Sequence, residues 1–378
     1  MNVKLSEFKI LTYDGEKIEV EVSSIEELSS LLSLAREMNL PIYTIPVDDS
    51  IDRGIWVYLS LSDVPFVIKK TSMLVSTPLD IELDDFQGKL VKEGLTWGHY
   101  PLFSSGRKTL REYFAIGFGL QNSTFFSRSR DFYTSGYFML PDGRRFKTVL
   151  TPRSAAGPDV GRFLMGSWET LAIVLQLNTR VYQMPPSYLE AAFSYYRWSD
   201  LVEEVKEIFA RRTTPDHLLL VPEAVLDDLF GNDHPDGNLV LLRLPVYDEK
   251  LSELRLRFVE KILKRGKRIP EEESAHLFRK ALDHFERSPA LKIYSALWSR
   301  IKELGGHRIV ISGCDVEGAG VIPLDGEEFD DLTMTYHYDI KAMVKDFKKK
   351  FPVFYNIFTQ LKRKLDPHNL LNPHILEV

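Results

Sequence analysis

The apolar positions near the start of the chain follow two different periods. Residues 7–22 alternate apolar and polar positions on either side of Asp14-Gly15, which predicts a two-stranded hairpin. Residues 25–38 instead repeat apolar positions every three or four residues, so we expect an amphipathic helix with Ser24 as its N-cap. Residues 41–45 again favour a strand. The pattern therefore predicts a unit in which one helix connects two strands.

Strand-like and helix-like patterns continue as far as residue 186. We expect one helix at 83–95 and strands at 56–61, 66–77, 144–150 and 170–182. Residues 109–142 are rich in Phe, Tyr and Gly, which predicts irregular backbone packed by aromatic rings. The run Met184-Pro185-Pro186 then interrupts the last strand, because proline supplies no backbone donor. We therefore place the first domain boundary at residue 186.

Beyond these prolines the pattern becomes that of an antiparallel sheet covered by helices. We expect a helix at 200–212, two long charged helices between 249 and 306, a strand pair around glycines at 307–324, and further strands at 189–198, 217–230 and 238–247. Residues 187–345 therefore predict a second domain of the α+β class, distinct from residues 1–186.

The end of the chain predicts a charged helix followed by a shaped tail. Basic residues at 345–350 and 361–364 share a helical pattern with four phenylalanines. That pattern indicates either a solvated face backed by an apolar one or a surface for a partner. A proline disfavours helical geometry in the residue before it, so Asp366-Pro367 predicts a helix end near Leu365.

Composition narrows the classes of protein that fit these patterns. The chain has 378 residues, which favours two domains, and its net charge of -6 gives no reason to expect nucleic acid or a membrane surface as a partner. Its single cysteine, Cys314, excludes an internal disulfide and favours a cytoplasmic location. No stretch approaches the roughly 20 apolar residues of a membrane span, and the alternating start lacks the apolar block of a secretory signal. Asp233, His234 and Asp236 stand among turn residues, so we expect no metal site there.

Three stretches carry a resemblance to a known family. They are the tail "LKRKLDPHNLLNPHILEV" at 361–378, "AGPDVGRFLMGSWETLAIVLQLNTRVYQMPP" at 156–186, and the aromatic segment at 109–143, which closes with Leu140-Pro141-Asp142-Gly143. Together they resemble the FAD-linked oxidases, whose members have the PCMH-type FAD-binding fold and include glycolate and D-lactate dehydrogenases.

The resemblance implies an α+β chain with three parts. Residues 1–186 would form a two-lobed PCMH-type FAD-binding domain, residues 187–345 an α+β cap with an antiparallel sheet, and residues 346–378 a C-terminal segment that returns to the first domain. It also implies FAD as the cofactor and hydride transfer from a hydroxylated substrate. The residues that would contact FAD are Arg53, Gly54, Arg111, Gly117, Gly119, Arg130, Asp131, Gly166, Ser167 and Asn372.

The catalytic residues stay open at this point. His337 and Asp339 alternate along a predicted strand and so face the same side. They could form an acid/base pair, or they could belong to a solvated strand face.

Bulky or charged residues stand at positions where the resemblance implies glycines. A diphosphate lies against bare backbone amides, yet the loop at 45–56 contains only Gly54, together with Asp48, Asp49 and Asp52. Arg111-Glu112 stands where relatives have a glycine pair, and Glu169 and Ala172 replace two later glycines. At all three contacts, residues with larger or charged side chains stand where the resemblance implies glycine. This argues against ordinary FAD binding.

Two hypotheses follow, and the sequence leaves open whether the protein is an enzyme. In the first, the chain keeps the scaffold, has lost the cofactor site, and docks a catalytic flavoprotein or an iron–sulfur subunit as an accessory protein. In the second, cationic contacts from Arg53, Arg107, Lys108 or Arg111 hold the diphosphate, and the enzyme oxidises a 2-hydroxy acid or a similar alcohol. The glycine positions favour the first.

Overall fold

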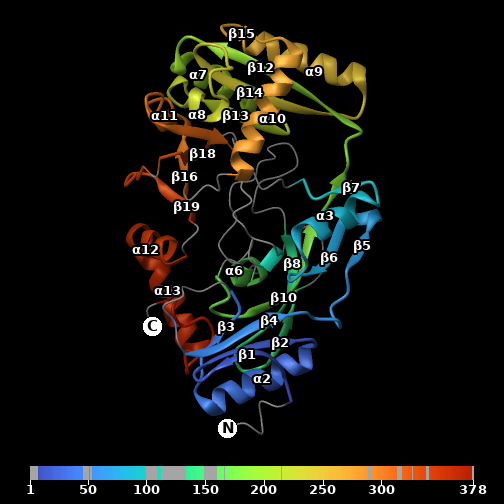
Figure 1. Cartoon of the computed structure of the whole chain (residues 1–378), viewed down its shortest axis with the longest axis vertical. Coiled ribbons are helices and arrows are strands. Elements are labelled where there is room, and N and C mark those ends of the chain that lie inside the picture. The colour runs from blue at the N-terminus through green and yellow to red at the C-terminus, as the bar shows by residue number, and fades with distance from the viewer. Residues whose placement is uncertain are drawn as a thin grey trace.

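A computed structural model describes most of the chain, and the statements below refer to those residues. They are 7–45, 51, 53–98, 109–111, 133–148, 160–165, 167–213, 215–287, 292–312, 317–325, 327–337 and 340–376. The molecule is elongated, with a four-stranded and a five-stranded sheet in its lower half, an eight-stranded sheet in its upper half, and a two-stranded sheet of β11 (Tyr182–Gln183) and β7 (Leu95–Thr96) (Figure 1).

The first lobe is a four-stranded sheet covered by one helix. Its strands lie in the order β1 (Lys9–Asp14), β2 (Lys17–Val22), β4 (Gly54–Leu59) and β3 (Ile42–Tyr43), and α2 (Ile25–Met38) packs on one face. The predicted hairpin β1–β2 is present, and its turn residues are Gly15 and Glu16, one position beyond the predicted Asp14-Gly15, with Gly15 at φ 60°. Ser24 accepts a hydrogen bond from the backbone N–H of Glu27 at 3.1 Å and caps α2, which confirms the predicted N-cap.

The second lobe is a five-stranded antiparallel sheet. Its strands lie in the order β5 (Val67–Lys69), β6 (Leu74–Pro78), β10 (Ile173–Arg180), β8 (Tyr133–Met139) and β9 (Arg145–Lys147), with helices α3 (Leu83–Val91) and α6 (Val160–Met165) beside it. Strand β10 is buried on both faces: Ile173 and Leu175 join the core of the first lobe, whereas Val174 and Leu177 join that of the second. This double burial explains the continuous apolar run in its sequence.

The upper half is built on an eight-stranded antiparallel sheet, here called the large sheet. Its strand order is β15 (Lys267–Arg268), β12 (Ser187–Tyr195), β14 (Asn238–Val246), β13 (His217–Val221), β17 (Ile309–Ser312), β18 (Gly318–Pro323), β16 (Lys292–Leu297) and β19 (Thr333–His337). Helices α7 (Trp198–Ala210), α9 (Glu249–Ile262) and α11 (Trp298–Ile301) cover one face, and α8 (Leu226–Phe230) and α10 (Glu271–Arg287) cover the other.

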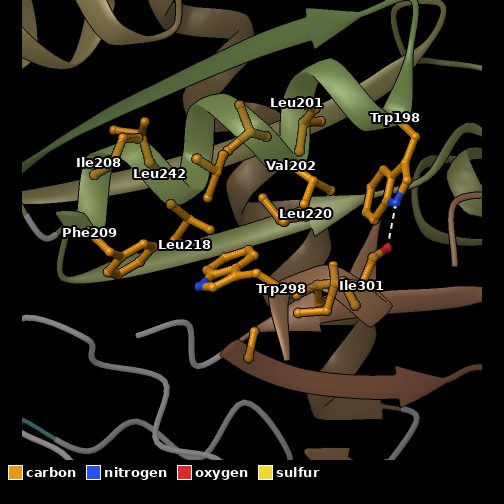
Figure 2. Packing of buried hydrophobic residues seen from close by; sticks show 14 of the residues in the cluster. Trp198, Leu201, Val202, Ile208, Phe209, Leu218, Leu220, Leu242, Trp298 and Ile301 are labelled. Carbon is orange, nitrogen blue, oxygen red and sulfur yellow. Dashed lines mark hydrogen bonds between the residues drawn. The ribbon is translucent and has the colours of Figure 1, made fainter. Parts of the chain in front are cut away.

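The core under α7 shows how the large sheet is stabilised. Leu201 and Val202 of α7 point toward Leu220 of β13, and the ring of Trp198 closes one end (Figure 2). The indole N–H of Trp198 donates to the carbonyl of Ile301 at 2.8 Å, so its one polar atom is satisfied while the ring is buried.

Two predictions for this half were wrong in detail. The segment 217–230 is not one strand, because β13 ends at Val221 and Leu226, Leu229 and Phe230 then recur at helical spacing in α8. The second charged helix ends at Arg287, and residues 292–297 form strand β16, in which buried Ile293 and Tyr294 are followed by alternating exposure. The strand pair predicted at 307–324 is confirmed as β17 and β18.

The two halves are connected twice. On one side, β11 (Tyr182–Gln183) pairs with β7 (Leu95–Thr96), the chain crosses at 184–186, and the hydroxyl of Tyr247 donates to the carbonyl of Gln183 at 2.7 Å. On the other side, α12 (Ile340–Lys350) and α13 (Pro352–Leu365) lead from β19 back to the first lobe (Figure 1).

The four phenylalanines of this returning segment divide into two pairs. Phe347 and Phe358 contact the ring of Trp168, at 5.9 and 6.3 Å between centroids, whereas Phe351 and Phe354 are exposed. The helical pattern of the sequence is therefore confirmed, with one apolar line turned inward.

The tail is shaped by a buried lysine. Helix α13 ends at Leu365, as predicted, and Lys362 is fully buried with its Nζ 2.5 Å from Asp366 Oδ2. The Asp366 carboxylate also accepts from the backbone N–H groups of Leu370 and Leu371, at 2.9 and 2.8 Å. Asp366 therefore fixes the turn that brings Leu371 beside β3, where Ile42 N donates to Leu370 O at 2.7 Å.

Candidate functional site at the junction of the two lobes

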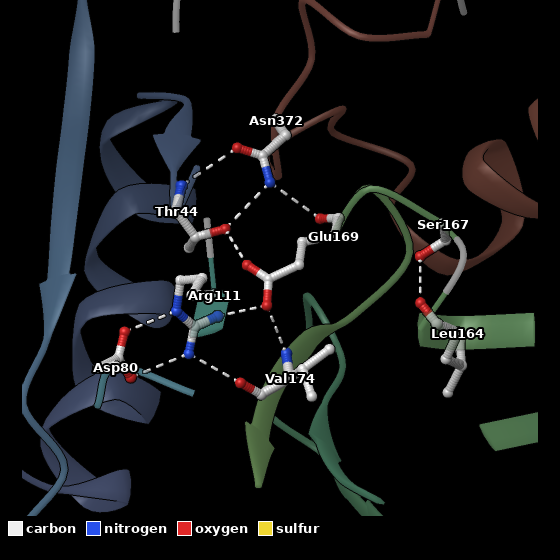
Figure 3. A network of polar contacts seen from close by, with 8 residues as sticks. All are labelled: Thr44, Asp80, Arg111, Leu164, Ser167, Glu169, Val174 and Asn372. Atoms are coloured by element: carbon white, nitrogen blue, oxygen red, sulfur yellow. Dashed lines mark hydrogen bonds and ion pairs between the residues drawn. The ribbon is translucent and has the colours of Figure 1, made fainter. Parts of the chain in front are cut away.

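Polar side chains from five separate segments meet where the two lobes join (Figure 3). Thr44 follows β3 in the first lobe, Asp80 follows β6, and Glu169 lies in the turn before β10. Arg111 comes from the segment at 109–111, and Asn372 comes from the tail. Because the five residues come from both lobes and from the tail, folding of both lobes and return of the tail are needed to assemble the group. We call these five residues the junction network.

Arg111 is the centre of the junction network. Its guanidinium makes a two-pronged contact with Asp80, Nε to Oδ1 at 2.7 Å and Nη2 to Oδ2 at 3.1 Å, and Nη1 donates to Glu169 Oε1. Nη2 also donates to the carbonyl of Val174 at 2.8 Å. Such bidentate pairing uses the planar fork of arginine in a way that lysine could not reproduce.

Glu169 and Asn372 tie the two lobes together. The hydroxyl of Thr44 donates to Glu169 Oε2 at 2.5 Å, and the backbone N–H of Val174 donates to Glu169 Oε1 at 2.9 Å. The amide of Asn372 donates to Thr44 Oγ1 at 3.1 Å and to the carbonyl of Glu169 at 3.0 Å, and it accepts from Thr44 N at 3.1 Å. Every polar atom of the Glu169 carboxylate is thereby satisfied inside the protein.

Burial governs the charges of this network. Arg111 and Glu169 are 4% and 3% exposed. Burial by itself would lower the pKa of the Arg111 guanidinium, but Asp80 and Glu169 outweigh it and raise that pKa, so the cation is locked in its charged form. Burial raises the pKa of the Glu169 carboxyl, which the charge of Arg111 partly opposes. The network thus holds the carboxyl groups of Asp80 and Glu169 around the single guanidinium of Arg111 in a largely buried position.

The arrangement leaves few donors for an anionic ligand. The backbone N–H groups of Thr44, Val174 and Leu371 all donate to side-chain oxygens of Asn372, Glu169 and Asp366. A carboxylate about 4 Å from a phosphate repels it by roughly 1 to 4 kcal/mol, and two carboxylates already share the one guanidinium. These residues do not fit the diphosphate of a dinucleotide at this point of the junction.

The other residues singled out in the sequence take different places. Arg53 is exposed. Gly54 begins β4, and its N–H donates to Glu16 O at 3.0 Å. A Cβ on Gly54 would stand 2.4 Å from the ring of Tyr43, so strand packing requires this glycine. Ser167 is buried, and its hydroxyl donates to Leu164 O at 2.7 Å.

Several predicted site residues fall outside the part of the chain that the structure describes. They are Gly117, Gly119, Arg130, Asp131, Gly166 and Asp339, together with Arg107, Lys108, Asp48, Asp49, Asp52 and Glu112. His337 is the last residue of β19 and pairs with Lys292 in the ladder. The predicted acid/base pair of His337 and Asp339 therefore stays a prediction.

Sequence reasoning treated Arg111 and Glu169 as two separate losses of glycine, whereas the structure pairs them. The signal that could have predicted this ion pair was the presence of opposite charges at two positions where the resemblance implies glycine. Thr44 and Asp80 were missed, because a threonine at a strand end and an aspartate in a turn carry no distinctive pattern.

Within the described residues, no group of three or more His, Cys, Asp or Glu side chains is placed to hold a metal ion. None of the described helices is long and apolar enough to cross a membrane.

Sequence comparison finds distant relatives that match part of the chain. A D-lactate dehydrogenase of Anaerostipes hadrus is 24% identical over 219 residues, which are 55% of this chain and 45% of the relative. An alkyldihydroxyacetonephosphate synthase of Caenorhabditis elegans is 23% identical over 163 residues, 43% of this chain and 27% of the relative. The matches thus span less than half the length of these relatives, and no protein-family model matches the chain.

Structural comparison covers nearly the whole chain. A solved alkyldihydroxyacetonephosphate synthase superposes with a TM-score of 0.69 at 15% identity, covering 94% of this chain and 76% of the other. A p-cresol methylhydroxylase with bound substrate gives 0.70 at 11% identity, covering 93% and 87%. The chain has the fold of the PCMH-type FAD-linked oxidases. A 4-ethylphenol oxidase from Gulosibacter chungangensis agrees, with 0.67 at 10% identity over 97% and 91% of the two chains.

The α+β fold class and the family resemblance read from the sequence are therefore confirmed. The chain shares the fold of these proteins, and two residues of its junction network, Arg111 and Glu169, stand at positions where the resemblance implied glycines.

Proposed function

We propose that the protein is a non-catalytic member of the FAD-linked oxidase family that serves as an accessory subunit of a flavin-dependent oxidoreductase. The observation that carries this proposal is the buried ion pair between Arg111 and Glu169. Both residues stand at positions where the family resemblance implies glycines. Their side chains fill the space that glycines would leave open, and their charges neutralise each other.

The energy of the junction network opposes entry of a dinucleotide. Removing one partner of a buried, hydrogen-bonded ion pair leaves an uncompensated charge and costs about 3 to 5 kcal/mol. A diphosphate that displaced Glu169 from Arg111 would meet the same cost, and it would also break the bond from Thr44 to Glu169 and the bond from Val174 to Glu169. FAD binding at this point would have to offset that loss before it gained any affinity.

The proposal is tested by the flavin content of the purified protein. We expect a colourless preparation that does not take up FAD in an equilibrium titration followed by flavin fluorescence. A matched variant, Arg111→Gly with Glu169→Gly and Asp80→Asn, removes both side chains together with the carboxylate that Arg111 neutralises, and it should bind FAD more tightly than the wild type. A yellow wild-type protein with one flavin per chain would contradict the accessory role, and equal FAD affinity in the two proteins would contradict the part given to the ion pair.

The partner of an accessory subunit would be a catalytic flavoprotein or an iron–sulfur subunit in the cytoplasm. Such a partner would supply the redox centre that this chain lacks under the proposal. The single cysteine of the chain supports a reducing compartment.

A second function is favoured by the named relative that is a D-lactate dehydrogenase. In this alternative the chain is an active FAD-dependent oxidoreductase that oxidises a 2-hydroxy acid such as glycolate or D-lactate, or a similar alcohol. Arg53 is exposed beside the first lobe and could supply a cationic contact in place of backbone amides. Reduction of an artificial electron acceptor by the purified, FAD-supplemented protein with D-lactate or glycolate would support this function, and no reduction with either acid would count against it.

A further inference from the structure

The outer face of α9 carries exposed apolar side chains in one line. Leu251, Leu254 and Phe258 are 58%, 60% and 39% exposed, and Tyr247, just before the helix, is 42% exposed. Within the helix, Leu251, Leu254 and Phe258 are three and four residues apart, which is the spacing of the apolar seam of a helix that packs along another helix, and Tyr247 precedes the N-cap Asp248. We call these four residues the α9 seam.

The α9 seam is additional to the face that holds the helix on the large sheet. The inward face consists of Ser252, Leu256, Val259 and Ile262, and its three apolar members belong to the core beneath α7 and α9. At about 100° per residue, the centre of the exposed seam lies roughly 110° round the helix from the centre of the inward face, so the apolar arc continues past its buried part into solvent. An exposed apolar arc of this kind marks an interaction surface.

The charged residues of α9 are sorted around the seam. At about 100° per residue, Lys250, Arg257 and Lys261 fall along one side of the seam, and Arg255 falls along the other. The glutamates of the helix lie beyond the row of three cations, where Glu253 pairs with Arg257 at 3.9 Å and Glu260 pairs with Arg268. This basic rim belongs to a chain whose net charge is -6, so it does not follow from overall composition.

We propose that the α9 seam docks an amphipathic helix of the partner subunit, with apolar residues at alternating three- and four-residue spacing and acidic residues on both flanks. This inference deepens the proposed accessory function and names the recognition chemistry of its partner. Apolar side chains of the partner would fill the line from Tyr247 to Phe258, and its carboxylates would face the basic rim.

Two other occupants fit the seam less well. A second copy of this chain would set basic rim against basic rim in either a parallel or an antiparallel pairing, and like charges at flanking positions oppose association. A membrane surface takes a helix whose broad apolar face is free over its whole width, whereas Leu256, Val259 and Ile262 on the adjoining part of the apolar arc of α9 are already packed in the core of the large sheet.

One end of the seam lies next to the segment at which the chain crosses from the lower half to the upper half. Helix α9 lies on the upper half, away from the junction network (Figure 1). Tyr247, the first residue of the seam, donates to the carbonyl of Gln183 at 2.7 Å, directly before the crossing at 184–186. A helix on the seam would therefore lie beside the crossing at 184–186 and away from the lobe junction.

The test uses the full-length protein and two synthetic peptides. Both carry Leu at every seam position over three heptads, and one has Glu and the other Lys at all flanking positions; like charges keep each peptide from pairing with itself. Fluorescence anisotropy of labelled peptide should show binding of the Glu peptide, weakened by added salt, and at least about tenfold weaker binding of the Lys peptide.

Variants of the seam make the test specific. Leu251→Ser with Leu254→Ser should weaken binding of the Glu peptide by about tenfold or more, and Lys250→Glu with Arg257→Glu and Lys261→Glu should reverse the preference toward the Lys peptide. The matched control, Val353→Ser with Phe354→Ser, removes exposed apolar area from α13 and should leave binding unchanged. All the changed residues are exposed, so each variant should keep the melting temperature of the wild type.

The possible outcomes separate the inference from the proposed function. Equal binding of the two peptides, or no effect of the seam variants, would overturn the docking site. Co-sedimentation with vesicles of phosphatidylserine and phosphatidylcholine, lost in the Leu251→Ser, Leu254→Ser variant, would replace it with a membrane surface. A flavin-containing protein that still binds the Glu peptide through the seam would refute the accessory role alone, and a flavin-free protein that binds neither peptide would refute the seam alone.

Discussion

The lobe junction and the large sheet are held together in opposite ways. At the junction, five polar side chains from distant segments satisfy one another around a buried cation, and Thr44 and Asn372 are 328 residues apart. In the large sheet, apolar side chains fill cores on both faces, and the Trp198 N–H makes a single hydrogen bond, to the carbonyl of Ile301 within the same half. The comparison teaches that a polar network is specific and intolerant of partial change, whereas an apolar core loses stability in proportion to what is removed.

The largest effect should come from breaking the junction at its cation. Arg111→Met leaves the Glu169 and Asp80 carboxylates without their partner, and we expect a loss of about 3 to 5 kcal/mol in the free energy of unfolding, measured with urea. The double variant Arg111→Met with Glu169→Leu should recover part of that loss, because it removes one stranded charge together with its partner. Additive losses in the two single variants and the double variant would show that the pair is not coupled.

A truncation in the core of the large sheet should lower the free energy of unfolding, and no partner substitution like that of Glu169 should recover the loss. Leu220 of β13 is fully buried beneath α7, so Leu220→Ala should cost about 2 to 4 kcal/mol through lost burial and the cavity left behind. Urea unfolding of Leu220→Ala, Arg111→Met and their combination measures this. The sites lie in different halves, so the two losses should add, and strong non-additivity would contradict the contrast between the regions.

The smallest effect concerns the buried lysine of the tail. Burial lowers the pKa of Lys362 below the ordinary lysine value of 10.5, although Asp366 partly opposes the shift. The unfolded chain then binds this proton more tightly than the folded chain, so stability rises with pH in the interval below 10.5. The slope of unfolding free energy against pH in that interval should be shallower in Lys362→Met, and an unchanged slope would assign it to other groups.

Much of the local structure was readable because its causes are local. The hairpin turn at Gly15, the Ser24 cap and the helix end at Leu365 each depend on residues within one turn of chain. Helix α8 was missed because Pro222 separates a strand from a short helix within one apolar run. The strand order of the large sheet depends on pairings between distant segments, such as β12 with β15, which no local pattern encodes.

Only part of the candidate site could be predicted, because contacts between distant segments leave no local pattern in the sequence. Arg111 and Glu169 were noticed because they are charged residues at positions where the family resemblance implies glycine. Their pairing was invisible, since 58 residues separate them and nothing in the sequence states that their side chains meet. Asn372 was singled out as a flavin contact, yet its side chain bonds to Thr44 and Glu169.

The return of the tail to β3 has a consequence for the order in which the chain acquires its structure. Synthesis proceeds from the N-terminus, and domains generally fold as units while it does so. The large sheet draws only on residues 187–337 and can form as soon as they emerge. Thr44 and Glu169, which precede the large sheet in the chain, pair with Asn372 only after the tail has been made, so the lobe junction is completed after the large sheet.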